Sequence, residues 1–259
     1  MLKFSPCIEM LFTDLPFLER IEQVAKLGFG AFEFWGWNNK DLPGILRKCE
    51  EVGIKVAVFG ISPREGRTAP IIDPRRRGEF LEAVRASVDV AAELGTKTLI
   101  VTTGNEIPEL SRGEQRESII AALTEAAPIV EASGITLVLE PLNTLVDHPG
   151  YFLSSSKEAF SIVGEVGSPN VKILYDIYHQ QIMEGNIIST IETNIDKIGH
   201  FHVADVPGRH EPGTGELNYR NIFKHIERSG YQGYVGLEFR PSGPSAESLK
   251  EVLEIAGSR

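Results

Sequence analysis

Four ionisable residues stand at or near the ends of short apolar runs in the second half of the chain. Glu140 ends Thr-Leu-Val-Leu-Glu, Asp176 ends Ile-Leu-Tyr-Asp, Glu238 closes Val-Gly-Leu-Glu, and His202 lies inside His-Phe-His-Val. Burying an unpaired carboxylate is costly, so a chain that does so repeatedly must compensate with a metal, a base or a hydrogen-bond network. Three carboxylates and one imidazole suit a divalent cation such as Mn²⁺, Mg²⁺ or Co²⁺ that keeps positions open for substrate oxygens. The pattern therefore predicts a metal site, with separate structural ion pairs as the alternative.

Two further polar residues follow these runs closely. His179 comes three residues after Asp176, so its side chain can face the same cavity; the alternative is a histidine satisfied within its own loop. Arg209 follows the run that holds His202, and its guanidinium fork can meet a substrate carboxylate or carbonyl. A solvated surface arginine is the alternative for Arg209.

Aromatic and acidic residues also close an earlier apolar run. Glu33, Trp35 and Trp37 lie at its end, where they can wall the same pocket. The alternative for the tryptophans is a core or rim position, which is the more common one for this residue.

The apolar runs are short and rich in Val, Ile, Leu and Phe, as is typical of strands covered on both faces. Amphipathic segments with helical spacing lie between them. The predicted strands are Lys3–Ile8, Ala31–Trp35, Lys55–Phe59, Thr98–Thr102, Thr136–Glu140, Lys172–Asp176, His200–Val203 and Val235–Phe239. The predicted helices are Leu15–Leu27, Phe80–Leu94, Ser118–Glu131 and Ser245–Ile255.

Glycines mark where several helices should end. Gly28, Gly53, Gly95, Gly134 and Gly230 each precede a predicted strand, and glycine readily takes the left-handed conformation that closes a helix. Eight strands in 259 residues correspond to the length of a βα unit, and eightfold right-handed βα repetition closes into a barrel. The prediction is an α/β protein with a single (β/α)8 TIM-barrel domain over residues 1–259. A doubly wound open sheet is the alternative, but its usual glycine-rich phosphate turn after the first strand is missing.

Composition restricts the class of partner. The chain has 26 Lys and Arg against 36 Asp and Glu, a formal net charge of −10, which argues against non-specific nucleic-acid binding. No apolar stretch approaches the ~18 residues that span a membrane, and the first residues do not resemble a signal peptide. Cys7 and Cys49 form no CxxC pair, which favours a reducing compartment. We expect a cytoplasmic protein with a small-molecule substrate, no nucleic acid and no membrane partner; the oligomeric state, a homo-oligomer included, stays open.

Several longer motifs resemble the hydroxypyruvate isomerase family, within the xylose-isomerase-like TIM-barrel group that also holds ketose 3-epimerases and apurinic endonucleases. The resemblance covers essentially the whole chain and is specific over Leu139–Pro241. The motifs are Leu-Glu-Pro-Leu-Asn (139–143), His-Pro-Gly-Tyr-Phe-Leu (148–153), Tyr-Asp-Ile-Tyr-His-Gln-Gln (175–181), Met-Glu-Gly-Asn (183–186), His-Val-Ala-Asp-Val-Pro-Gly-Arg-His-Glu-Pro (202–212), Gly-Glu-Leu-Asn-Tyr (215–219) and Gly-Tyr-Gln-Gly-Tyr-Val-Gly-Leu-Glu-Phe-Arg-Pro (230–241). The segment Phe34-Trp35-Gly36-Trp37 departs from typical hydroxypyruvate isomerases, which leaves the substrate open.

The resemblance implies a metal-assisted isomerase of carbohydrate metabolism in which two glutamates move protons. They match Glu140 and Glu238. In related epimerases the residues that match Glu140, Asp176, His202 and Glu238 hold the metal, and those that match His179 and Arg209 contact the substrate. The implied reaction converts hydroxypyruvate to tartronate semialdehyde.

Three other functions compete with this one. A ketose 3-epimerase would use the same residues on a longer substrate. A DNA-repair endonuclease on this fold would need more histidines and a basic face, whereas this chain has six histidines and a charge of −10. A non-catalytic sugar- or protein-binding barrel would be suggested by loss of one of the two glutamates, and both are present.

Overall fold

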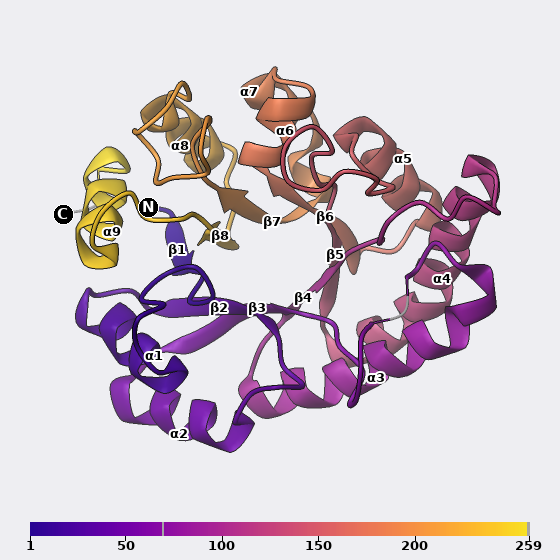
Figure 1. Ribbon diagram of the computed structural model, residues 1–259, viewed down its shortest axis with the longest axis horizontal. Coiled ribbons are helices and arrows are strands. Elements are labelled where there is room, and N and C mark those ends of the chain that lie inside the picture. The colour runs from indigo at the N-terminus through magenta and orange to yellow at the C-terminus, as the bar shows by residue number, and fades with distance from the viewer. Residues whose placement is uncertain (69, 258–259) are drawn as a thin grey trace.

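Eight short parallel strands form the centre of the molecule, and helices surround them in a ring (Figure 1). The computed structural model describes residues 1–68 and 70–257. The strands are β1 (Lys3–Pro6), β2 (Ala31–Gly36), β3 (Lys55–Gly60), β4 (Thr98–Val101), β5 (Thr136–Leu139), β6 (Val171–Asp176), β7 (Ile198–Val203) and β8 (Tyr234–Leu237). Each predicted strand is present, with ends shifted by at most two residues.

The strand order is β1-β8-β7-β6-β5-β4-β3-β2, so neighbours in sequence are neighbours in space and β1 pairs with β8. The remaining junction, between β2 and the end of β1, is made by a parallel bridge from Cys7 to Glu33. The amide of Ile8 donates to the carbonyl of Glu33 at 3.0 Å in the same place. The predicted α/β barrel is confirmed.

Helices connect the strands and cover their outer faces (Figure 1). They are α1 (Phe17–Lys26), α2 (Leu42–Val52), α3 (Arg77–Leu94), α4 (Arg112–Ser133), α5 (Ser156–Val166), α6 (Ile177–Met183), α7 (Ile187–Asn194), α8 (Tyr219–Arg228) and α9 (Ser245–Ile255). Two short 3-10 helices cover Pro74–Arg76 and Ile195–Lys197. In residues 1–68 and 70–257, no helix has both the length and the apolarity that crossing a membrane requires.

Helix ends follow local capping chemistry. The predicted helix at Ser118–Glu131 in fact begins at Arg112, because Ser111 and Glu114 form a capping box that starts α4 earlier than its apolar periodicity indicates. Gly53, Gly95 and Gly134 end α2, α3 and α4 with positive φ, as predicted.

Side chains alternate between the outside and the inside of the barrel along each strand. Outward residues join the large core between strands and helices, whereas four aliphatic residues form a separate cluster, Val58, Ile100, Val138 and Leu174. Two positions after Val138 and Leu174 on the same face come Glu140 and Asp176. The strand period therefore places Glu140 and Asp176 one layer above this aliphatic cluster.

An aromatic stack supports the strand that carries Trp35. The rings of Phe34 and Phe59 lie 5.5 Å apart with an interplanar angle of 9°, and Phe59 is fully buried. Stacked aromatic pairs contribute beyond the area that they bury. This packing fixes β2 against β3 near the ends of both strands.

We expect Phe59→Ala to lower the free energy of unfolding by about 3–5 kcal/mol, because a large buried ring is replaced by a cavity. Urea unfolding followed by circular dichroism measures the change. Leu46→Ala is the control, since Leu46 is 37% exposed on α2 and should cost less than about 1 kcal/mol. Similar losses in both variants would contradict the role of the Phe34–Phe59 stack.

Candidate active site

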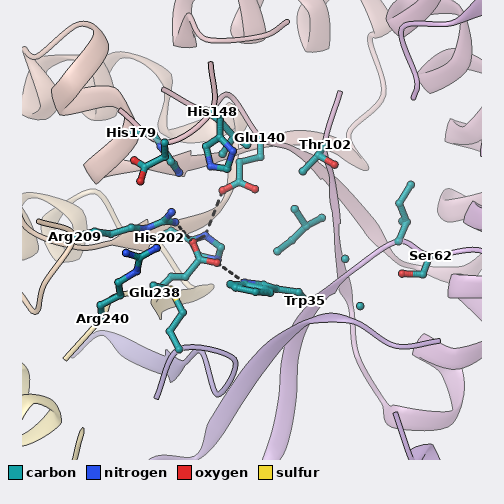
Figure 2. A pocket seen from close by; sticks show the side chains of 17 residues that line it. Trp35, Ser62, Thr102, Glu140, His148, His179, His202, Arg209, Glu238 and Arg240 are labelled. Carbon is teal, nitrogen blue, oxygen red and sulfur yellow. Dashed lines mark hydrogen bonds and ion pairs between the residues drawn. The ribbon is translucent and has the colours of Figure 1, made fainter. Parts of the chain in front are cut away.

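A cavity of about 500 Å³ opens at the carboxyl ends of the strands (Figure 2). Its charged groups gather on one side, and Thr102 and Ser62 lie across from them. The lining residues include Trp35, Glu140, His148, His179, His202, Arg209, Glu238 and Arg240. Barrel enzymes build their active sites at this end of the strands.

The four residues predicted to bind a metal lie together at this mouth. Glu140, Asp176, His202 and Glu238 are all buried, and each offers a ligand atom within 4.8 Å of the others. His202 Nδ1 is central to the group, 3.4 Å from Glu140 Oε1, 4.0 Å from Asp176 Oδ2 and 3.3 Å from Glu238 Oε2. Each residue comes from a different strand or strand end, from β5 to β8.

Burial and the neighbouring charges shift the pKa values of these residues in opposite directions. Burial alone would lower the pKa of His202, but the charges of Glu238 and Glu33 outweigh it, so the pKa is raised well above its ordinary value. Burial raises the pKa of Asp176, although Arg209 and His202 oppose the change. Burial would also raise the pKa of Glu238, yet His202 and Arg209 hold it below its ordinary range. The surrounding carboxylates therefore favour positive charge at the centre of the group.

The residues present fit a divalent cation. His202 Nδ1 is buried and makes no hydrogen bond of good geometry, although three carboxylates surround it. Carboxylate oxygens and a neutral imidazole are ligands that Mg²⁺, Mn²⁺ and Co²⁺ accept. A cation would satisfy the imidazole nitrogen and the three carboxylates together.

His179 lies at the same mouth, and one of its ring nitrogens already accepts a hydrogen bond. Its Nδ1 accepts from the backbone amide of Asn143 at 3.2 Å, and the side-chain nitrogen of Asn143 lies 2.7 Å away. Burial and the nearby Arg209 lower the pKa of His179 to about 3, so the ring is neutral. The proton is therefore on Nε2, which is buried, makes no hydrogen bond with any described residue and lies 3.5 Å from Asp176 Oδ2. His179 can donate a hydrogen bond to an oxygen of a bound molecule.

Arg209 reaches the mouth from the loop after β7. One of its terminal nitrogens donates to Glu238 Oε2 and lies 3.6 Å from Asp176 Oδ2. Its guanidinium also lies over the ring of Tyr178, 5.2 Å from the centroid. Only 13% of the side chain is exposed, so it is not a solvated surface arginine.

The loop that carries Arg209 is held by a buried carboxylate. Asp205 Oδ1 accepts from the amides of Val206 and Leu217 at 2.9 and 3.1 Å, and Oδ2 accepts from the amide of Gly213 at 2.8 Å. Arg209 itself has a φ of +58°, a conformation that is uncommon for a side chain of its size. Asp205 therefore holds the backbone that presents Arg209.

Of the three residues at the end of β2 that were candidates to wall the pocket, Trp35 does so and the other two do not. Its indole is 52% exposed, lines the cavity and donates through Nε1 to Glu238 Oε1 at 2.6 Å (Figure 2). Trp37 is buried and donates to Ser87 Oγ at 2.9 Å, so it is a core residue, as the alternative stated. Glu33 is also buried and lies below the mouth, because it is two residues before Trp35 on the inward face of β2.

Other residues at the mouth were not predicted. Arg240 lines the cavity beside Arg209 (Figure 2), and its position two residues after Glu238 was a usable signal. Asp147 also lines the cavity and accepts from Asn143 and from Tyr178 at 2.7 and 2.8 Å. Asp147 and Asn143 belong to a long loop after β5, where strand periodicity gives no indication of direction.

Comparison with known proteins gives a consistent result. Residues 21–256 match the model of the family described as xylose isomerase-like TIM barrel. The chain is 36% identical to hydroxypyruvate isomerase of Escherichia coli K12, over 96% of this chain and 98% of that protein. It is 33% identical to 2-oxo-tetronate isomerase of Cupriavidus necator, over 95% and 96%. A crystal structure named AP endonuclease, family 2, from Brucella melitensis is 34% identical with a TM-score of 0.92, covering 98% of this chain and 99% of that one.

We expect Asp205→Ala to destabilise the protein by about 3 kcal/mol or more, because three backbone N–H groups lose their acceptor and each unpaired group costs ~1–3 kcal/mol. Urea unfolding measures this loss, and limited proteolysis should show new cleavage within residues 206–217. Glu216→Ala is the matched control, because Glu216 is exposed in the same loop. Resistance of Asp205→Ala to both tests would contradict the role of this carboxylate.

Proposed function

The chain belongs to the xylose isomerase-like TIM barrel family and is an isomerase, and we propose that it converts hydroxypyruvate to tartronate semialdehyde. The observation that carries the proposal is the meeting of Glu140 and Glu238 with Asp176 and His202 around one point of the mouth. Two carboxylates from β5 and β8 can serve one substrate as proton acceptor and proton donor.

The reaction moves hydrogen between two neighbouring carbons. One glutamate removes a proton from C3 of hydroxypyruvate, beside the C2 carbonyl, and an enediolate forms. A proton is then returned to C2 by the other glutamate, and the proton of the C3 hydroxyl passes to the C2 oxygen, so that C3 becomes the aldehyde and C2 carries the hydroxyl. Atoms and electrons balance without an oxidant, and proton-transfer groups of this kind contribute about 10²–10⁴ in rate.

Glu140, Asp176, His202 and Glu238 are the residues that would hold a divalent ion, Mn²⁺, Mg²⁺ or Co²⁺. Such an ion supplies Lewis-acid polarisation of the substrate carbonyl when bound. His179, neutral with its proton on Nε2, would donate to a substrate oxygen. Arg209 would hold the substrate carboxylate, because its fork can form two parallel charge-assisted hydrogen bonds.

The names of the relatives favour a short keto acid over a ketose. The proteins of Escherichia coli and Cupriavidus necator are named for isomerisation of hydroxypyruvate and of 2-oxo-tetronate. Ketose 3-epimerisation is the second candidate, because the half-exposed indole of Trp35 offers a flat apolar face for a longer sugar. The net charge of −10 disfavours a DNA-repair endonuclease, and the presence of both glutamates disfavours a non-catalytic barrel.

We expect Glu140→Gln and Glu238→Gln each to lower kcat on hydroxypyruvate by about 10²-fold or more, because each substitution removes a proton-transfer group. The assay is turnover with Mn²⁺ present, and circular dichroism checks that both variants remain folded. Glu216→Gln, on the exposed part of the loop after β7, is the control. Wild-type turnover in either active-site variant would exclude the two-glutamate mechanism.

Substrate choice is tested with hydroxypyruvate, 2-oxo-tetronate, D-fructose and D-tagatose, each assayed with Mn²⁺, Mg²⁺ or Co²⁺ after chelator treatment. We expect the keto acids to give the higher kcat/KM, and chelation to abolish turnover. Arg209→Lys should reduce kcat/KM for the keto acids more than for the ketoses, because lysine cannot form the bidentate contact. If the ketoses instead give the higher kcat/KM and Arg209→Lys affects both substrate classes equally, the keto-acid isomerase assignment fails and ketose 3-epimerisation takes its place.

A further inference from the structure

A buried acidic side chain lies one layer below the mouth and has no part in the proton transfers proposed above. Glu33 is on β2, and only 2% of its surface is exposed. Its Oε2 accepts from Ser5 Oγ at 2.8 Å and lies 3.1 Å from His200 Nε2. Its Oε1 lies 3.0 Å from His202 Nε2. Burying a carboxylate this deeply costs free energy unless nearby cationic or hydrogen-bonding groups compensate for the lost hydration.

The contact with His202 connects this layer to the mouth. The imidazole of His202 has Nε2 toward Glu33 and Nδ1 toward Glu140, Asp176 and Glu238. His202 Nε2 and Glu33 Oε1 make no hydrogen bond of good geometry, but they lie 3.0 Å apart. Because an ionised carboxylate can only accept hydrogen bonds, this close contact favours a proton on Nε2. The other nitrogen, Nδ1, is then the one whose lone pair is available to a cation.

This contact is possible because the neighbouring residue on β8 is a glycine. Gly236 lies on β8, next to His202 in the β7–β8 pairing. A Cβ atom at this position would come within 2.5 Å of Glu33 Oε1 and 2.5 Å of His202 Cδ2. Real Cβ atoms do not approach other atoms so closely. The absence of a side chain on β8 therefore lets a carboxylate of β2 reach an imidazole of β7 through the interior of the barrel.

We propose that Glu33 is a positioning residue that fixes the orientation and tautomer of His202, so that Nδ1 faces the mouth as a ligand for a divalent cation. This inference rests on the proposed function only in taking His202 as a ligand. Outer carboxylates that hold a metal-binding histidine by its second nitrogen typically change metal affinity or activity by about 10–100-fold when mutated.

Glu33, His200 and His202 also form a group that could itself hold an ion. Two observations favour positioning over a second ion. Glu33 Oε2 is already occupied by Ser5 and His200, and the cavity at the mouth is not lined by Glu33 or His200. A single ion per chain is therefore expected.

The first test is a titration of the metal-free protein with Mn²⁺, followed by the electron paramagnetic resonance signal of the free ion. We expect one Mn²⁺ per chain, and we expect Glu33→Gln to weaken binding by about 10–100-fold. Ser5→Ala is the matched control, because it removes a contact of Oε2 and leaves the Oε1 side of Glu33 in place; its affinity should change much less. Unchanged Mn²⁺ affinity in a folded Glu33→Gln, or two ions bound per wild-type chain, would overturn the proposal.

The second test needs no substitution. Nitrogen-15 spectra of the wild-type histidines with Mg²⁺ bound should show the His202 proton on Nε2, and a proton on Nδ1 would overturn the proposal. These readouts are separate from turnover. A wild type that isomerises hydroxypyruvate while Glu33→Gln binds Mn²⁺ normally would refute the role of Glu33 alone, whereas an inactive wild type with the predicted loss of affinity would refute the proposed function alone.

Discussion

The crowding of negative charge around His202 is the constraint on which the arrangement of the barrel mouth depends. Three carboxylates approach Nδ1 from one side and a fourth lies against Nε2 from the other. Inside a protein such a group is tolerated only with compensating positive charge. Arg209 supplies part of it, and its own position depends on Asp205 and the loop that Asp205 holds. The loop after β7 thus supplies positive charge to the carboxylates at the strand ends.

The strands meet this requirement with a simple periodicity. Residues two apart face the same side of a strand, so each residue at the mouth has a partner one layer down. On β5 and β6 that partner is apolar, Val138 or Leu174, whereas on β7 it is His200. The interior is therefore divided, with an aliphatic half below Glu140 and Asp176 and a polar half below His202. In the polar half, Glu33 contacts His202 from the layer below the mouth.

Much of this could be read from the sequence, and the failures have physical causes. The strands and the glycine helix ends depend on local chemistry, so they were predicted closely. No ranges were predicted for α2, α5, α6, α7 and α8. Of these, α6 and α7 have only 7 and 8 residues, too few to show a clear helical period. The place of Trp37 could not be decided from the sequence, because the backbone beyond Gly36 leaves the strand and alternation no longer indicates direction. The contact between Trp35 and Glu238 joins residues 203 positions apart, and only the closed barrel brings them together.

The junction between β1 and β2 has a consequence for how the barrel opens. Elsewhere neighbouring strands are joined by ladders of backbone hydrogen bonds, but here the backbone link is the bridge from Cys7 to Glu33. The Glu33 side chain crosses the same seam to Ser5 and continues to His200 and His202. We therefore expect a ligand that orders His202 to stabilise this seam as well, since a ligand that binds only the closed form favours that form. Amide protons beside the seam should exchange with solvent faster than those of the central strands, and a ligand at the mouth should slow them.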